Sequence, residues 1–298
     1  MYITCDSYRI FYYVAKCGNV SKAAKLLLSN QPNLTRMIKK LEAELHCPLF
    51  SRSNKGMKLT PEGERLYEHI RIAMEHIEAG ESEILSSRNL ENGTVFLAAS
   101  EVALRCLLLP VLKEFRLLHP GIHIRVSNHS TPQAIDALKE GAADLALVTT
   151  PTVPSASLTE TAVRPIREAA VCSPYFSGLL GREVSLSELQ DYPLISLGSG
   201  TKSYEFYSAL FTTQGLNYKP DIEAFTADQI LPMVEADLGI GFVPEEFLRK
   251  GDGVCRIRLK ETIPERSIVL IKRKEQPLSA AARELERMIR TQGQTESS

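Results

Sequence analysis

The residues best suited to chemistry lie between positions 30 and 45. Leu34, Ile38, Leu41 and Leu45 recur at helical spacing and form one narrow apolar stripe. The opposite face of the same helix is basic and carries small hydrogen-bonding groups: Pro32, Arg36 and Lys39, flanked by Asn33, Thr35 and Lys40. Arginine and asparagine can form paired hydrogen bonds to guanine and adenine edges in the major groove, and lysine can contact phosphate. The face therefore suits base reading, although a solvated basic surface remains the alternative.

Three short helices are predicted to position this face. The first buries Phe11 and ends at Gly18-Asn19, and the second, capped by Ser21, buries Ala23 and Ala24. Asn30 is expected to cap the third helix. Since Pro32 has no amide hydrogen, this cap must act on the amide of Asn33.

The segment from Phe50 to Leu59 is predicted to form a hairpin with Lys55-Gly56 at its tip. It would present Arg52, Lys55 and Lys58 for backbone or minor-groove contacts. Charge supports this assignment, because residues 1–60 carry 10 Lys/Arg against 3 Asp/Glu, whereas residues 61–298 carry 25 against 33. A basic head on an acidic body is typical of a nucleic-acid-binding module joined to a second domain.

This pattern resembles the winged helix-turn-helix of the LysR-type transcriptional regulators. The resemblance rests on many positions in register: Phe11, Val14, Gly18, Ser21, Ala23-Ala24, Leu27, Gln31-Pro32, Leu34, Ile38, Leu41-Glu42, Leu45, Leu49-Phe50, Arg52, Thr60 and Gly63. Two positions depart from the family. Asn30 stands where Ser or Thr is usual, and His46 replaces a helix-ending glycine, so it is expected to adopt a left-handed conformation.

The resemblance implies a sequence-specific DNA-binding transcription regulator with double-stranded operator DNA as its partner. The residues expected to contact DNA are Ser21, Asn30, Gln31, Pro32, Asn33, Thr35, Arg36, Lys39, Arg52 and Lys55. The expected fold class is an N-terminal all-α winged helix-turn-helix with a long linker helix, followed by a C-terminal α/β two-lobed, periplasmic-binding-protein-like effector domain.

A long helix is predicted to follow the DNA-binding domain of residues 1–60. Thr60 caps it and Pro61 opens it. Leu66, Ile70, Ala73, Ile77, Gly80 and Ile84 then form a heptad seam. The seam favours a dimerising linker over residues 61–90, which would place two recognition helices on adjacent half-sites. Packing of the helix on its own domain is the alternative.

Residues 91–298 alternate strands and helices, which predicts α/β lobes with largely parallel sheets. A single helix is expected over Val102–Leu118. Crossings near Val163–Ile166 and Ile263–Ser267 would divide the domain into lobe I, about 91–163 and 267–298, and lobe II, about 164–266. The family pattern also matches Leu238-Gly239-Ile240-Gly241, whereas Asp237 stands where the family often has glycine.

Polar groups at strand ends are the candidate effector contacts: Ser100, Glu101, Ser130, Thr131, Thr149, Ser199, Gly200, Thr201, Thr226 and Gln229. Gly198-Ser199-Gly200-Thr201 offers amides at a helix start, which suits a carboxylate or similar anion. Glu101 instead favours a cationic or polyhydroxyl ligand, and helix capping is the alternative for each hydroxyl. We expect a small-molecule effector, with an anionic one favoured.

Other functions find little support in the sequence. GxxxxGK[ST], GxSxG, HExxH and GxGxxG motifs are all missing, which argues against an enzyme, a metal site and a cofactor. No apolar run approaches the ~20 residues of a membrane span, so a cytoplasmic location is expected. The other expected partners are a second copy of the chain, in a dimer or tetramer formed through the linker helix and the effector domain, and RNA polymerase.

The six cysteines are scattered and are expected to be reduced. A redox-sensing regulator in which Cys106 and Cys172 form a switch pair is the main alternative, with Arg105 beside Cys106 as a thiolate-stabilising charge. A soluble α/β enzyme or binding protein is a weaker one.

Overall fold

The protein is described by a computed structural model that covers residues 3–53, 56–85, 92–249, 251 and 253–295. The chain divides into two compact units, Met1–Ser87 and Arg88–Ser298. Each unit has its own hydrophobic core, and each is described separately.

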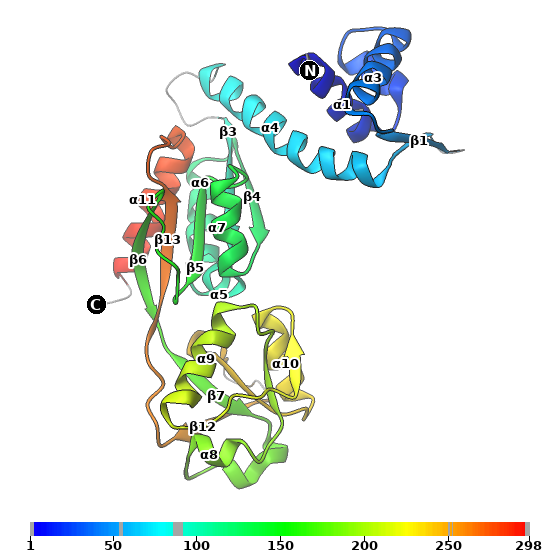
Figure 1. The fold of residues 1–298 in the computed structure, drawn as a ribbon. Helices are drawn as coiled ribbons and strands as arrows, with labels where there is room; N and C mark the ends of the chain where they lie inside the picture. Colours follow the sequence, from blue (N-terminus) through cyan, green and yellow to red (C-terminus); the bar gives the residue numbers. More distant parts are fainter. Residues whose placement is uncertain (1–2, 54–55, 86–91, 250, 252, 296–298) are drawn as a thin grey trace. The chain divides into compact units, whose positions relative to one another are not determined.

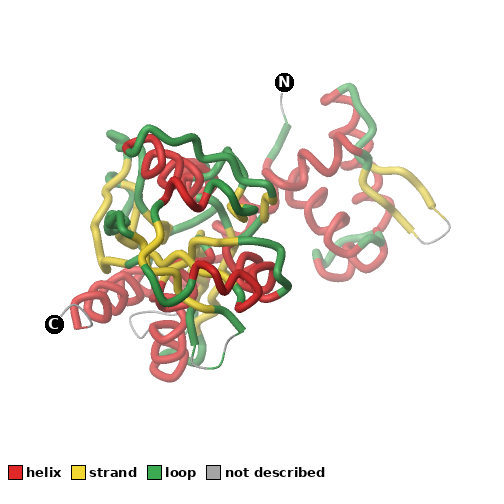
Figure 2. The backbone as a smooth tube through the Cα atoms, turned by 90° about the horizontal axis from the view of Figure 1, so that it is seen from below, coloured by secondary structure: helices red, strands yellow, loops and turns green. Residues whose placement is uncertain are grey.

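The first unit is a helical cluster with a two-stranded hairpin. Its elements are α1 (Cys5–Cys17), α2 (Val20–Leu26), α3 (Gln31–Leu45), β1 (Phe50–Ser53), β2 (Gly56–Leu59) and α4 (Pro61–Leu85). The antiparallel hairpin of β1 and β2 projects from one edge of the helices (Figure 2). Leu34, Ile38 and Leu41 of α3 are buried, so the predicted apolar stripe forms the inner face of that helix.

Helix caps follow the predictions in three of four places. Asn30 Oδ1 accepts from the Asn33 amide at 2.9 Å, and Thr60 Oγ1 accepts from the Gly63 amide at 3.0 Å. His46 is left-handed, with φ of 54°. The prediction for Ser21 was wrong. Asn19 caps α2, because its extended backbone starts the helix at Val20 and its carboxamide accepts from the Lys22 amide at 3.0 Å.

The seam of α4 has two environments. Leu66 and Ile70 pack against the core of Phe11, Leu41 and Leu49 in the same unit. Further along, Ala73 and Ile77 are exposed, and the Ile84 side chain lies outside the described residues. The first half of the seam therefore packs on its own domain, which was the alternative to a dimerising linker. The second half has an uncovered apolar face.

The second unit contains two lobes. Lobe I is built from β3 (Gly93–Ala99), α5 (Glu101–Ala103), η1 (Leu104–Leu108), α6 (Leu109–Leu118), β4 (Ile122–Asn128), α7 (Thr131–Lys139), β5 (Leu145–Thr149), β6 (Leu158–Ile166), β13 (Arg266–Arg273) and α11 (Ala280–Thr295). Its sheet has the order β4-β3-β5-β13-β6 (Figure 1).

Lobe II lies between the two crossings. It is built from β7 (Glu168–Cys172), η2 (Pro174–Leu179), β8 (Glu183–Val184), α8 (Leu186–Leu189), β9 (Leu194–Leu197), α9 (Lys202–Thr213), β10 (Ile222–Ala224), η3 (Ala227–Gln229), α10 (Ile230–Glu235), β11 (Ile240–Pro244), η4 (Glu245–Phe247) and β12 (Cys255–Leu259). Its sheet has the order β10-β9-β11-β7-β12-β8.

Both sheets are mixed: among the described residues five of their nine strand pairings are parallel, so the expectation of largely parallel sheets is only partly confirmed. β3 pairs in parallel with β4 and β5, but β13 is antiparallel to both of its neighbours, and β7 is antiparallel to β11 and β12. The cause is the double crossing between lobes. The chain passes from β6 to β7 through Arg167 and returns from β12 to β13. After these crossings β7 runs antiparallel to its neighbours in the lobe II sheet, and β13 runs antiparallel to its neighbours in the lobe I sheet.

The single helix expected over Val102–Leu118 contains a π-helical segment, η1, between α5 and α6. Pro110 has no amide hydrogen and cannot donate to the carbonyl of Cys106 four residues earlier. Arg164 Nη1 of β6 donates to that carbonyl at 2.5 Å. The wider turn is therefore tied to a strand that leads into the crossing.

Candidate DNA interface and ligand pocket

The outer face of α3 presents the predicted polar residues to solvent. Pro32, Arg36 and Lys39 are exposed, and Asn33 and Thr35 are partly exposed, while the opposite stripe is buried. The helical periodicity thus correctly predicted which side chains are available to a partner. Asn30 and Gln31 are also exposed, at the start of the helix.

Hydrogen bonds hold several of these side chains in place. Arg36 Nη2 donates to Asn33 Oδ1 at 3.2 Å, and Ser21 Oγ of α2 donates to Gln31 Oε1 at 3.0 Å. The Thr35 hydroxyl donates to the Gln31 carbonyl at 2.9 Å. Ser21 therefore links α2 to the start of α3 instead of capping its own helix. The remaining Arg36 donors lie on the exposed face, where they could reach base edges.

A groove of about 390 Å³ separates α2 and α3 from the hairpin. It is lined by predicted DNA-contact residues of both helices, including Ser21, Gln31, Thr35 and Lys39. The Met57 amide donates to the Gly18 carbonyl at 3.1 Å and fixes β2 beside the end of α1. The Arg52 side chain and Lys55 lie outside the described residues, so their predicted contacts stay predictions.

The second unit holds a cavity of about 490 Å³ to which both lobes contribute. Eight of the ten predicted effector residues line it: Ser100, Glu101, Ser130, Thr131, Thr149, Gly200, Thr201 and Thr226. Ser199 and Gln229 are not among the lining residues. Gln229 Oε1 accepts instead from the Phe225 and Thr226 amides at 2.9 and 3.3 Å, so its side chain closes a capping turn.

Several lining residues were missed by the sequence reasoning: Asn128, His129, Gln133, Lys202, Ser203, Glu223 and Phe225. Most are neighbours of predicted residues, so a wider window at each strand end would have included them. No sequence signal distinguished Phe225, although its side chain is 87% exposed.

The hydroxyls at the pocket also cap helices. Ser100 Oγ accepts from the Ala103 amide at 3.2 Å, and Thr201 Oγ1 accepts from the Tyr204 amide at 3.2 Å. Thr226 and Ser130 take part in capping boxes. These groups hold the helix starts in place around the cavity, and the capping alternative is correct for each of them as a structural role.

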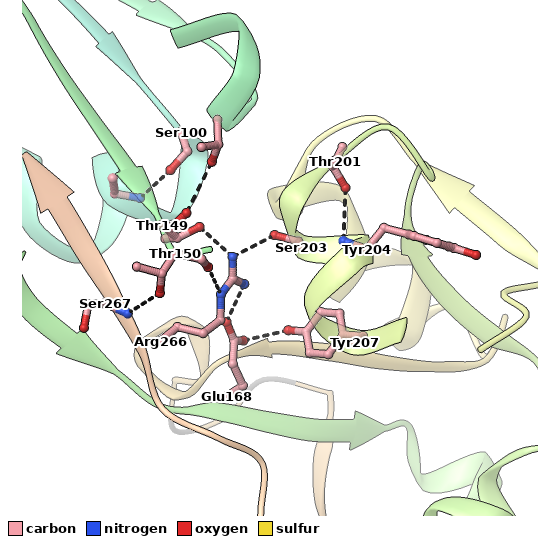
Figure 3. Close-up of polar contacts among 12 residues, drawn as sticks. Ser100, Thr149, Thr150, Glu168, Thr201, Ser203, Tyr204, Tyr207, Arg266 and Ser267 are labelled. Atoms are coloured by element: carbon pink, nitrogen blue, oxygen red, sulfur yellow. Dashed lines mark hydrogen bonds and ion pairs between the residues drawn. The ribbon is translucent and has the colours of Figure 1, made fainter. Parts of the chain in front are cut away.

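A buried ionic network between the lobes includes two residues that line the pocket, Thr149 and Ser203 (Figure 3). Arg266 Nη1 of β13 donates to Glu168 Oε1 of β7 at 3.0 Å, and its Nη2 donates to Thr149 Oγ1 at 2.6 Å and to Ser203 Oγ at 3.2 Å. The Tyr207 hydroxyl of α9 donates to Glu168 Oε2 at 2.9 Å. Burial raises the pKa of Glu168, while Arg266 and Tyr207 act in the opposite direction. The network therefore links Thr149 and Ser203 of the pocket to β7 and β13, the strands at the two crossings.

A second depression, of about 640 Å³, lies over β7 and β12 in lobe II. Four of its charged residues already form two ion pairs, Arg167 with Glu265 at 3.1 Å and Arg256 with Glu245 at 2.5 Å. This depression therefore offers less unmatched charge to a ligand than its arginines alone would indicate.

The cysteine alternative finds no support in the surroundings of the two thiols. Cys106 is buried in the core shared by the lobes, and Cys172 belongs to the separate core of lobe II. Burial raises the pKa of Cys106 to about 12 and that of Cys172 to about 11, although Arg105 lowers the former slightly. Both changes oppose formation of the reactive thiolate.

The described residues hold neither a cluster of metal-binding side chains nor a helix that could span a membrane. No group of three or more His, Cys, Asp or Glu side chains is placed to bind a metal ion. Within the same residues, no helix has the length and apolar character needed to cross a membrane.

The chain matches two protein families along most of its length. Residues 5–64 match the bacterial regulatory helix-turn-helix protein, lysR family, and residues 88–294 match the LysR substrate binding domain. Among individual proteins, it is 26% identical over 248 residues to the HTH-type transcriptional regulator CysL of Bacillus subtilis (strain 168), covering 82% of each chain. It is also 28% identical over 286 residues to the uncharacterized regulator YbhD of Escherichia coli (strain K12), covering 93% of this chain and 88% of that one.

Solved structures share the fold. CbnR, a LysR family transcriptional regulator, superimposes with a TM-score of 0.72 at 20% identity, over 98% of this chain and 99% of its own. Full-length CbnR in complex with its target DNA gives the same TM-score, over 98% and 100% of the two chains. With matches to both the DNA-binding and the substrate-binding domain, this chain belongs to the LysR family of bacterial DNA-binding transcriptional regulators, and not to a family of enzymes.

Proposed function

We propose that this regulator reads its operator with the outer face of α3 and responds to a small molecule bound between the lobes of its second unit. In this assignment residues 1–60 form the DNA-binding domain, residues 61–90 the linker and residues 91–298 the effector-binding domain. The main support for this proposal is the hydrogen bond between Arg36 and Asn33, which lie on the exposed face of a helix whose other face is buried.

The proposed base readers are Pro32, Asn33, Thr35 and Arg36. Arg36 and Asn33 are the residue types that form bidentate bonds to guanine and adenine. Lys39, one turn further along the exposed face, is assigned to phosphate. Arg52 and Lys55 are assigned to the wing contacts that their positions in the sequence predict.

For the effector we propose an anionic group at the start of α9. The first-turn amides of a helix have no intrahelical partner, and the helix dipole favours negative charge there. Gly200, Thr201, Lys202 and Ser203 all line the cavity at this point. Ligand binding would change the position of one lobe relative to the other through the crossing strands.

We further propose that the regulator acts as a dimer or tetramer. The exposed Ala73 and Ile77 on α4 support contact with a second copy, since an apolar seam at heptad spacing is stabilised by a partner helix. We also propose that the protein is cytoplasmic and that RNA polymerase is a further partner. Both proposals rest on the sequence and on the regulatory role.

The deciding experiment compares the full chain with a fragment beginning at Arg88. The full chain should select a preferred sequence from a random DNA pool and bind it far more tightly than unselected DNA. The fragment should lose DNA binding but keep a cooperative thermal transition that a small metabolite raises. Selected DNA retained by the fragment, or a full chain without sequence preference, would contradict the assignment.

A further inference from the structure

The pocket between the lobes carries an unbalanced negative charge. Four titratable side chains line it in the described part of the chain, namely Glu101, His129, Lys202 and Glu223. The Lys202 ammonium lies 2.6 Å from Glu205 Oε2, so its charge is already matched. Burial lowers the pKa of His129, which favours the neutral ring at pH 7. Two carboxylates, Glu101 and Glu223, therefore face the cavity without a matching cation on its wall.

Glu101 is the more constrained of the two carboxylates. It is partly buried, and its Oε2 accepts one hydrogen bond, from Asn128 Nδ2 at 3.1 Å. Burial, and then the negative charge of Asp228, raise the pKa of Glu101, while Arg105 offsets this less strongly. Arg105 is engaged elsewhere, with its guanidinium 4.0 Å from the centre of the Phe247 ring. A positive charge supplied by a ligand would stabilise the ionised Glu101.

An aromatic ring stands beside these carboxylates. Phe225 lines the same cavity and is 87% exposed, next to the end of β10 on which Glu223 lies. Its ring is therefore available to contact a ligand in the cavity. An aromatic face together with carboxylates is the combination that recognises protonated amines and quaternary ammonium groups.

The cavity can also bind a negatively charged group of a ligand, but Arg266 is not the residue that would bind it. The guanidinium of Arg266 is matched by Glu168 and donates to Thr149, Ser203 and the Thr150 carbonyl, so it offers little to a further anion. At the start of α9 the Thr201 amide donates to the Gly198 carbonyl and the Tyr204 amide to Thr201 Oγ1. The amides of Lys202 and Ser203, which line the cavity, are therefore the ones at this helix start that suit an anion. Glu223 Oε2 lies 3.4 Å from where a Cβ on Gly198 would stand, so this carboxylate lies beside the same loop and would repel a bare anion.

We infer that the effector is a small zwitterion of the amino-acid class, with its amine facing Glu101 and Phe225 and its carboxylate on the first-turn amides of α9. This inference rests on the proposed function of the pocket and extends it from an anionic group to a pair of opposite charges. The amine of a zwitterion pairs with Glu101 while its carboxylate accepts from the α9 amides, whereas a dicarboxylate would place a second negative charge against Glu101.

Matched triads of compounds test the inference on the full chain. Each triad contains an L-amino acid, the same acid without its amine, and the amine without its carboxylate, each measured by thermal shift and then by calorimetry. At least one amino acid should raise the melting temperature, and both truncated partners should bind at least tenfold more weakly. If the acid without its amine binds as well, or if no amino acid of the set stabilises the protein, the inference is overturned.

Variants connect the result to the pocket. Glu101→Gln should weaken binding of the amino acid at least tenfold, and Phe225→Ala, on an exposed side chain, should weaken it several-fold. Glu140→Gln makes the same charge change at the exposed end of α7 and should leave binding unaltered. Tighter binding by Glu101→Gln would contradict the inference.

DNA binding separates this inference from the proposed function. If a dicarboxylate alone alters operator binding, the cleft is regulatory and the zwitterion inference fails. If an amino acid binds with the expected variant pattern but operator binding is unchanged, the ligand class is supported and the regulatory role fails.

Discussion

Two arginines define the contrast between the units of this regulator. Arg266 in the second unit is 2% exposed, pairs with Glu168, and donates to groups from both lobes. Arg36 in the first unit is exposed and has one hydrogen bond, to Asn33 of its own helix. The same residue type thus stabilises the fold at position 266 and is available to bind a partner at position 36.

Physical chemistry explains the difference. A buried charge is tolerated only when it is paired and hydrogen-bonded, so each residue around Arg266 is needed by its neighbours. An exposed arginine loses little when its neighbours change, because water replaces them. Changes at Arg266 should therefore act on stability, and changes at Arg36 on DNA binding.

The largest expected effect follows replacement of Arg266 by methionine. The variant keeps the length of the side chain but leaves Glu168 buried without its cation, which typically costs ~3–5 kcal/mol. Chemical denaturation of the full chain, followed by circular dichroism, should show that loss in the transition of the second unit. Arg167→Met is the matched control, since its pair with Glu265 is exposed and should contribute under ~1 kcal/mol.

Adding Glu168→Gln to Arg266→Met should recover part of the lost stability, because it removes the unpaired charge. An equal loss in Arg167→Met, or no recovery in the double variant, would mean that packing and not charge pairing dominates at the crossing.

The next effect concerns Arg36→Ala. It should weaken binding to the preferred DNA by ~1–3 kcal/mol if Arg36 reads a base edge, with the melting temperature unchanged. Lys39→Ala is the comparison, because loss of a phosphate contact weakens binding on all sequences and lowers the salt slope by about one. Fluorescence anisotropy at several salt concentrations measures both effects. If Arg36→Ala weakens binding to random DNA as much as binding to the preferred sequence, Arg36 contacts phosphate and does not read a base.

A smaller effect is expected from Asn30→Ala. Its carboxamide accepts from the Asn33 amide at 2.9 Å, and loss of such a cap costs ~1 kcal/mol of stability. Asn30→Ser should keep most of the stability, as serine also caps well. If denaturation curves match the native protein while Asn30→Ala weakens DNA binding, then Asn30 contacts DNA and the cap matters little.

The sequence predicted the parts of this protein that local rules control. The buried and exposed faces of α3 follow from helical spacing, and the caps at Asn30 and Thr60 follow from residue type. Ser21 shows the limit of such rules. Serine and Asn19 are both good caps, and only the extended backbone at Asn19 decides where α2 begins.

Contacts between segments far apart in the chain could not be predicted from the sequence. Arg266 and Glu168 stand 98 positions apart, and neither belongs to a motif that marks it as buried. A carbonyl of the π-helical segment before Pro110 accepts from Arg164 of β6, 58 positions further along the chain, and the antiparallel strands depend on the double crossing between lobes. Eight effector candidates reached the pocket because strand ends gather at sheet edges, whereas Phe225 was found only from its exposure.

The smallest effect is expected at the cysteines, and it tests whether the second unit senses oxidants. Burial raises the pKa of Cys106 to about 12 and of Cys172 to about 11, so both stay protonated at pH 8, where an ordinary thiol is partly ionised. In the native protein both thiols should resist iodoacetamide at pH 8, and both should react after unfolding in guanidinium. Mass spectrometry after peroxide treatment should find no disulfide between them and DNA binding should not change. A Cys106–Cys172 bond that alters operator affinity would instead require the two cores to open, and would make oxidation a second input to the regulator.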